Sequence, residues 1–165
     1  MSPGRALAPL KGLLAVMALG ACQIGVEGID RPPAGSAPVM IGTFPGFQGL
    51  MNTARAGPGL NPLSYNAKLA AAAQVHADDM SANNFFSHVG SDGSSFAQRI
   101  VAQGYNYAWA AENIAQGQVS EAEVFADWMN SASHRANILS AEPTEFGLAW
   151  APGNYWVLEL ARPLP

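Results

Sequence analysis

The fold class is decided by residues 146–160, FGLAWAPGNYWVLEL, in a chain of 165 residues. Phe146, Leu148 and Trp150 alternate with smaller side chains, and an apolar run returns at residues 155–160. The four residues between them, 151–154, have proline and glycine at their centre and suit a tight turn. A period of two on either side of a tight turn predicts an antiparallel β-hairpin.

Four helices are predicted before this hairpin. The first covers about residues 47–55 and ends at the Gly-Pro-Gly of 57–59. The second begins at an N-cap, Asn66, and continues to about residue 82. Apolar side chains recur along it at spacings of four, three and four, which places His76 on the buried stripe. A histidine in that position is expected to be a partly buried core residue with a hydrogen bond.

The third and fourth helices are recognised by their first residues. Ser95 with Gln98, and Ser120 with Glu123, have the spacing of capping boxes. Gly104 stands after the third helix, where a left-handed C-cap is expected. Helices first and strands late predict an α+β domain, in which about four helices cover a small antiparallel sheet, and not alternating βαβ units.

Residues 1–21 have the features of an export signal. Arg5 and Lys11 precede the uncharged run GLLAVMALG, which is too short to span a bilayer comfortably. The sequence LGAC at residues 19–22 resembles the lipobox of bacterial lipoproteins, in which the cysteine is lipidated and becomes the first residue of the mature protein. Cys22 is also the only cysteine of the chain. The alternative is an ordinary signal peptide that leaves Cys22 as a free thiol.

Residues 22–45 are predicted to be a flexible tether that begins with the lipidated cysteine. Four prolines in this segment alternate with glycine and serine, a composition that favours an extended chain over a packed one. The folded domain is therefore placed at residues 46–162.

The charge of the chain excludes one class of partner. Removing residues 1–21 leaves six basic and twelve acidic side chains, a net charge of −6. Nucleic acid is therefore not an expected partner. Because no basic patch could hold an anionic membrane, membrane attachment is expected to depend on the lipid at Cys22.

Several common catalytic patterns do not occur in the sequence: the HExxH helix, the GxSxG elbow, the phosphate-binding loop and the dinucleotide fingerprint. Three polar groups remain, and each is expected at the end of an element. They are FFSH, which ends at His88, AEN, which ends at Asn113, and SASHRANIL at residues 131–139, which is interpreted as the exit from the fourth helix. Asn113 is interpreted as a turn-forming residue.

Seven segments occur in an order that resembles a known family. They are AAAAQVHADDM, FFSHVGSDG, QRIVAQGY, AENIAQG, DWMNSASHRANIL, FGLAW and YWVLEL. Together they are similar to bacterial members of the CAP superfamily, the group of cysteine-rich secretory proteins, antigen 5 and pathogenesis-related proteins. The resemblance covers about residues 47–161. It implies an α-β-α sandwich with an open central cleft.

The resemblance also implies which residues line that cleft. Many members of the family have two histidines and two acidic residues there, and the matching positions in this chain are His88, Glu112 and His134. The fourth position, three residues after Trp128, is Ser131 instead of an acid. The site is therefore expected to lack one of its four members.

Two neutral imidazoles and a carboxylate that converge in a cleft suit a divalent cation such as zinc, with His88 and His134 as ligands. Such a metal acidifies bound water, and Glu112 is the candidate catalytic base. Ser131 weakens both expectations, because it removes a second acid from the site.

Three classes of function follow for a protein that is exported and anchored at the cell envelope, in the outer membrane or periplasm if the source has two membranes. The first is a binding module for a lipid, glycan or peptide. The second is a hydrolase, either metal-assisted or based on a histidine–carboxylate pair. The third is a structural or interaction module whose cleft has no function. No serine lies in a recognisable nucleophile motif, so binding ranks above catalysis, and the sequence does not decide whether the protein is an enzyme.

Overall fold

The computed structural model describes residues 44–165, so the predicted export signal, Cys22 and the tether before residue 44 lie outside the described residues. Residues 44–165 form five helices and four strands. The helices are α1 (Pro45–Ala56), α2 (Ala67–Asn83), α3 (Phe96–Ala102), α4 (Glu121–Asn130) and α5 (Ala132–Ile138). The strands are β1 (Ser64–Tyr65), β2 (Tyr107–Gln116), β3 (Glu145–Ala151) and β4 (Tyr155–Pro163). No helix in this part of the chain has the length and apolar character that a membrane crossing needs.

The strands form one sheet in the order β1-β3-β4-β2. The predicted hairpin is confirmed, because β3 and β4 are antiparallel and Ala151 pairs with Tyr155 across the turn. Gly153 and Asn154 in that turn have positive φ angles, which these two residue types tolerate best. β2 lies antiparallel to β4 on its other side. β1 runs parallel to β3, so the sheet is mixed and not purely antiparallel, and a strand of two residues is too short to leave a periodic pattern.

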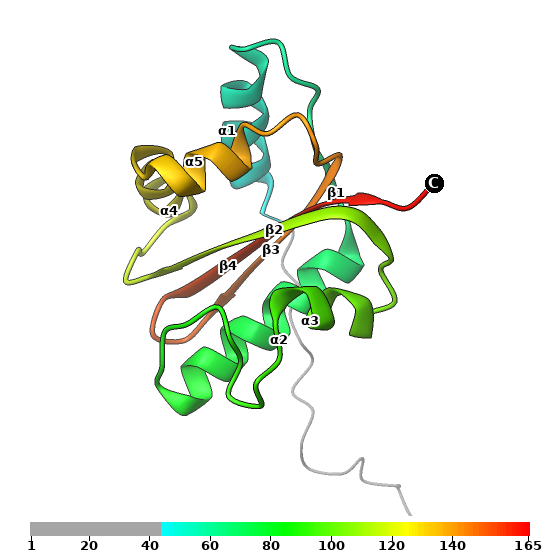
Figure 1. Cartoon of the computed structure of the whole chain (residues 1–165). Coiled ribbons are helices and arrows are strands. Elements are labelled where there is room, and N and C mark those ends of the chain that lie inside the picture. The colour runs from blue at the N-terminus through cyan, green and yellow to red at the C-terminus, as the bar shows by residue number, and fades with distance from the viewer. Residues whose placement is uncertain (1–43) are drawn as a thin grey trace, which may run out of the picture. The chain divides into compact units, whose positions relative to one another are not determined.

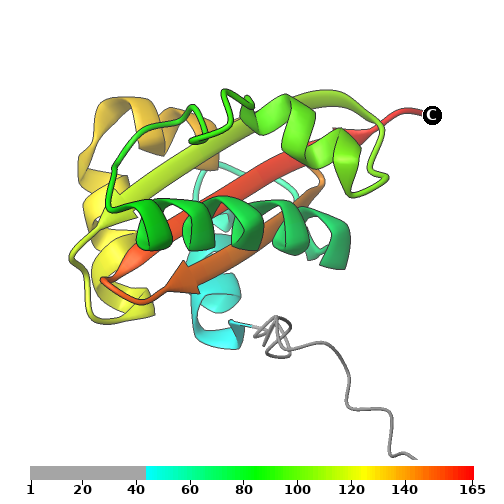
Figure 2. The ribbon, with the colours of Figure 1, turned by 90° about the horizontal axis from the view of Figure 1, so that it is seen from below.

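Helices cover both faces of the sheet, as the predicted α-β-α sandwich requires (Figure 1). α2 and α3 lie on one face, and Figure 2 shows α2 lying over the strands with α3 beside it. α1, α4 and α5 lie on the other face. Since β2 is at the edge of the sheet, residues from both layers can meet beyond it.

The alternation of side chains along β4 gives each face its own core. Leu158 and Leu160 pack on the side of α1 and α4, around Phe47 and Trp128. Val157, the residue before Leu158, points to the other face and packs against the alanines and the methionine of α2. The sheet is therefore buried on both faces along its two central strands.

α2 approaches the sheet closely at Gly147 of β3. A Cβ atom built on Gly147 would lie 2.1 Å from the backbone nitrogen of Ala70 and 2.2 Å from the carbonyl carbon of Leu69. A real Cβ atom does not come this close to backbone, so the packing of α2 on the sheet requires glycine here.

The predicted starts of three helices are confirmed. Asn66 caps α2 through its side-chain oxygen. Ser95 and Gln98 form a complete capping box at α3. At α4 half of the box forms: the Ser120 hydroxyl accepts a hydrogen bond from the Glu123 N–H, whereas the Glu123 carboxylate accepts from the N–H of the residue before Ser120. Capping patterns therefore located the helices well.

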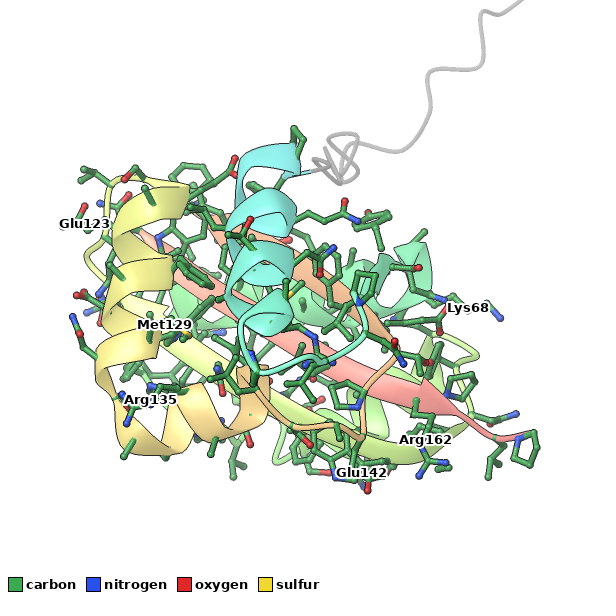
Figure 3. All side chains as sticks on the ribbon, turned by 90° about the horizontal axis from the view of Figure 1, so that it is seen from above. Lys68, Glu123, Met129, Arg135, Glu142 and Arg162 are labelled. Atoms are coloured by element: carbon green, nitrogen blue, oxygen red, sulfur yellow. The ribbon has the colours of Figure 1, made fainter. Side chains whose placement is uncertain are left out.

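The interpretation of residues 131–139 as a helix exit was wrong. α4 ends at Asn130, Ser131 is extended with φ −86° and ψ 124°, and a separate helix, α5, follows. Arg135 of α5 donates a hydrogen bond to the Met129 carbonyl at 2.7 Å and so ties the two helices together at their junction (Figure 3). A single extended residue between two helical segments leaves little trace in the apolar period, which explains the error.

The strand β2 was not predicted either. Glu112 and Asn113 were expected at the end of an element, but both lie inside β2, and Asn113 is a buried strand residue and not a turn-former. β2 has the sequence YAWAAENIAQ. Its alanines weaken the contrast between its two faces, so no clear two-residue period marks it as a strand.

Candidate functional site

Glu112 of β2 is the most deeply buried member of the predicted site. Its side chain is 1% exposed, and both of its oxygens have partners. Oε1 lies 2.7 Å from His88 Nδ1, and Oε2 accepts a hydrogen bond of 2.7 Å from the Arg99 guanidinium. A buried carboxylate is stable only when it is paired and hydrogen-bonded, and here one cation and one imidazole satisfy it.

His88 stands in the loop between α2 and α3, and Arg99 of α3 holds that loop in place. The Arg99 guanidinium donates to the carbonyl oxygens of His88 and Ser94, at 3.1 and 2.9 Å. The His88 side chain is 54% exposed, so its ring is accessible to a ligand although Glu112 fixes one of its nitrogens. Because Nδ1 faces Glu112, Nε2 is the ring nitrogen left for a ligand.

His76 supports the same loop from α2. It lies on the buried stripe of α2 and is hydrogen-bonded, as predicted, but its burial is complete and not partial; its Nε2 lies 2.8 Å from the carbonyl oxygen of Ser87. Burial lowers the pKa of His76, an effect that the neighbouring Glu112 opposes and Arg99 reinforces. His76 is therefore a neutral structural residue behind the site and not a member of it.

His134 reaches the site from α5, on the other face of the sheet. Asn113 of β2 donates to the His134 carbonyl oxygen at 3.1 Å, and Asn137 donates to the Asn113 side-chain oxygen at 2.8 Å. Burial, and secondly the proximity of His88, lower the pKa of His134. The ring is therefore neutral at pH 7, and Asn113 is the link that holds its helix against β2.

Two cavities lie at this edge of the sheet. The first has a volume of about 410 Å³, and its lining includes Phe86, Ser131 and His134. The second has a volume of about 320 Å³ and is lined in part by His88 and Glu112. The structure thus brings His88 and Glu112 into direct contact and places His134 near His88, in a neighbouring cavity. We call these two cavities the histidine cleft.

Ser131 occupies the fourth position of the predicted set. It lies at the junction of α4 and α5, in the cavity that His134 also lines. Its hydroxyl is 3.3 Å from that of Ser133. A neutral hydroxyl therefore stands on the α5 side of the cleft, where an acid would have added a negative charge.

The carboxylate of the predicted zinc site already has hydrogen-bond partners in this structure. Both oxygens of Glu112 are engaged, by His88 and by Arg99. Among residues 44–165, no three histidine, cysteine, aspartate or glutamate side chains gather in a way that would hold a metal ion. Uptake of zinc or another divalent cation therefore stays a prediction from the sequence alone.

Two residues of this arrangement were not singled out from the sequence. Arg99 was within a segment that carried the family resemblance, but a charged residue in a short helix normally faces solvent, and nothing marked this one as buried. Asn113 was noticed but was assigned to a turn, because β2 was not recognised. In both cases the tertiary position, and not the local pattern, determines the role.

The fold and this geometry can be compared with known proteins. The family model of the cysteine-rich secretory protein family, CAP, matches residues 48–160. The uncharacterized protein YkwD of Bacillus subtilis is 36% identical over 108 residues, which are 65% of this chain and 42% of that protein. The uncharacterized membrane protein YlbC of the same organism is 33% identical over 99 residues, which are 60% of this chain and 29% of that protein. The chain thus matches less than half the length of these curated relatives.

Solved structures give the same result for the fold. An extracellular protein containing an SCP domain from Bacillus anthracis matches with a TM-score of 0.69 at 26% identity, over 72% of this chain and 39% of that one. An outer surface protein of Borrelia burgdorferi matches with a TM-score of 0.64 over 71% of this chain and 90% of that one, and its 21% identity supports the fold alone. The chain belongs to the cysteine-rich secretory protein (CAP) family, although Cys22 is its only cysteine.

Proposed function

We propose that this chain is an exported, lipid-anchored CAP protein of the cell envelope whose histidine cleft binds a ligand. The observation that carries the proposal is the half-exposed His88 ring, which the buried Glu112–Arg99 pair fixes through Nδ1. A ring held in this way offers Nε2 to a ligand with little loss of side-chain entropy on binding. The neutral His134 supplies a second imidazole nearby.

The size and lining of the cleft indicate the class of ligand. Volumes of about 410 and 320 Å³ are at the lower end of the range for small-molecule sites. Phe86 at the first cavity is half exposed, while Gln116 and Gln118 add polar groups to the same lining. This mixture suits part of a lipid, a glycan or a peptide, with an apolar group against Phe86 and a polar group against the imidazoles.

Hydrolysis is the second candidate, because a histidine with its Nδ1 against a buried carboxylate is the arrangement of a general base. Within residues 44–165, however, no serine hydroxyl is hydrogen-bonded to the His88 or His134 ring. Binding is therefore preferred to catalysis. A structural module without a working cleft is the third candidate, and it predicts that no ligand will perturb either histidine.

The expected location also belongs to this proposal. Residues 1–22 have the pattern of a lipoprotein signal, and two proteins of similar fold are described as an extracellular protein and an outer surface protein. An acyl chain on Cys22 would keep the domain at the envelope at the end of its tether.

Ligand binding is expected to be visible at the histidines. The full chain with 15N-labelled histidine would be titrated with a fatty acid, a chito-oligosaccharide and a mixture of short peptides, and one of these probes is expected to shift the His88 and His134 ring signals saturably. His88→Ala and His134→Ala should each weaken binding by about tenfold or more, since each removes a direct contact worth at least ~1.4 kcal/mol.

The matched control for these variants is Arg162→Ala. Arg162 has an exposed side chain that pairs with Glu142 and is not among the residues lining the cleft (Figure 3). This variant should leave the affinity unchanged. If no probe moves either ring signal, or if both histidine variants bind as tightly as the wild type, ligand binding at the cleft is refuted. Release of a cleaved product from a probe that Glu112→Ala no longer converts would favour the hydrolase.

Lipid attachment is tested separately. Cys22→Ser should prevent incorporation of labelled palmitate in the native host and should move the protein from the membrane fraction to the soluble fraction, because serine cannot be lipidated at the lipobox cysteine. Cys22→Ala serves as the control for loss of the thiol. Acylation of either variant would contradict lipidation at Cys22.

A further inference from the structure

A second carboxyl group lies buried beside Glu112. Glu159 of β4 is the register partner of Glu112 in β2, and Glu159 is fully buried. Residues directly opposite each other in paired antiparallel strands have their side chains on the same face of the sheet, with Cβ atoms about 5 Å apart. The partner of Glu159 on β3 is Gly147, which has no side chain, so α2 closes over this position.

Neither oxygen of Glu159 has a hydrogen-bond donor among residues 44–165. The neighbouring carboxyl group, Glu112, has its donors elsewhere, in His88 and Arg99. Two ionised carboxylates cannot hydrogen-bond each other, because both are only acceptors. One proton between them removes this conflict, since a protonated carboxyl group donates to a carboxylate.

The charges around the pair decide which group carries the proton. Glu112 has the Arg99 guanidinium at 2.7 Å and the His88 ring at the same distance, so its negative charge is the better compensated of the two. Burial, the Glu112 charge and hydrogen bonding to Glu112 all raise the pKa of Glu159 well above its ordinary value, against a smaller opposite effect of Arg99. From α2, His76 faces the pair closely enough for Glu112 and Arg99 to affect its pKa, and Asp79 acts on His76 in turn. From the loop, the His88 ring contacts Glu112.

We propose that Glu159 is a positioning residue of the histidine cleft: it remains protonated and donates its carboxyl proton to Glu112, which in turn holds the His88 ring. The Glu112 carboxylate then accepts hydrogen bonds from three donors: the Arg99 guanidinium, the His88 Nδ1–H and the Glu159 carboxyl group. The second carboxyl group next to Glu112 therefore comes from strand β4. The position where the family resemblance implied a second acid, at the junction of α4 and α5, is occupied by Ser131. This role rests on the ligand contact proposed for His88, and it explains how that ring is held in place.

The proton can be observed directly on the wild-type chain. Carboxyl 13C NMR with labelled glutamate should show one neutral carboxyl signal at about pH 6, where ordinary glutamates are ionised, and that signal should be missing in Glu159→Gln. This measurement needs no ligand, so it can fail while ligand binding holds, and the reverse is also true. A spectrum in which every glutamate is ionised at about pH 6 would overturn the proposal.

The stability of the fold should report the same proton. Because the folded-state pKa of Glu159 is raised, its protonated form contributes stability that is present below the unfolded-state pKa and is lost as the pH rises through the folded-state pKa. The urea midpoint of the wild type should therefore fall relative to that of Glu159→Gln as the pH is raised from about 5 to about 9. A difference that stays constant or rises with pH would contradict a protonated Glu159.

The positioning role has its own readout. Glu159→Gln keeps a donor for Glu112 and should leave the His88 tautomer, with the proton on Nδ1, unchanged in 15N spectra. Glu159→Leu keeps the volume but removes the donor, and His88 should then populate both tautomers. An unchanged tautomer in a folded Glu159→Leu protein would show that Glu159 does not act through Glu112, and the 13C spectrum remains decisive if this variant does not fold.

Discussion

Replacing Glu112 by alanine is expected to lower the free energy of unfolding by about 3–5 kcal/mol, because it leaves a charged guanidinium without a partner in the interior. The Arg99 side chain is 4% exposed and donates to Glu112 at 2.7 Å, so water cannot take the place of the lost carboxylate. The same change removes the group that fixes His88 Nδ1. We therefore expect a loss of stability together with a loss of ligand binding.

The chain offers a matched control for this prediction. Arg162 and Glu142 form the same kind of ion pair at 2.9 Å, but their side chains are about half exposed. Glu142→Ala should cost no more than about 1 kcal/mol, since exposed pairs contribute little. Urea unfolding followed by tryptophan fluorescence measures both variants. Equal small losses would mean that Glu112 is not a buried ion-pair partner.

Gly147→Ala is expected to have the largest effect on the fold, a destabilisation of more than about 4 kcal/mol. The added methyl group would meet the backbone of Leu69 and Ala70, not a flexible side chain that could turn away. α2 would have to move off the sheet, and with it the packing of Val157 and the cover over Glu159. Most of the protein should be unfolded or aggregated at about 37 °C.

Gly49→Ala is the control for this substitution. Gly49 lies in α1, and a Cβ atom there would have no neighbour within 4 Å. Alanine at this position should therefore stabilise the protein, by up to about 1 kcal/mol, because alanine favours a helix more than glycine does. Thermal unfolding by circular dichroism distinguishes the two variants. A Gly147→Ala protein with wild-type stability would refute the close approach of α2 to β3.

The fold was largely predictable because its helix starts and its hairpin leave local signals. Ser95 with Gln98 and the turn before Tyr155 depend on neighbours within four residues, and such patterns can be read from a sequence. β1 is a different case, since two residues become a strand only because β3 lies beside them. β2 is likewise defined by its pairing with β4 more than by its own alanine-rich sequence.

The candidate site was predictable only in part, for the same reason. His88, Glu112 and His134 were named through the family resemblance, and their separation in sequence gives no information on distance. The side chains that hold them in place belong to other elements of the chain. Arg99 of α3 donates to Glu112, and Asn113 of β2 donates to the His134 carbonyl oxygen of α5. A buried arginine and a buried glutamate, such as Arg99 and Glu159, are normally surface residues, and only the packed structure identifies them as exceptions.

The arrangement also explains why the cleft can combine rigidity with access. Glu112 is anchored in the central layer of the sandwich, where β2 cannot move without breaking its pairing with β4. His88 is in a loop, but Arg99 and His76 hold its backbone on two sides. The ring therefore has a fixed inner nitrogen and an accessible outer one, the property that a recognition site needs.

The most direct test of this account is the tautomer of His88, measured by 15N NMR of the full wild-type chain at about pH 8, where an ordinary histidine is neutral. We expect a proton on Nδ1, hydrogen-bonded to the Glu112 carboxylate, and an unprotonated Nε2 that is available to a ligand. A proton on Nε2, or an equal mixture of the two tautomers, would contradict it, because His88 would then not be held by Glu112.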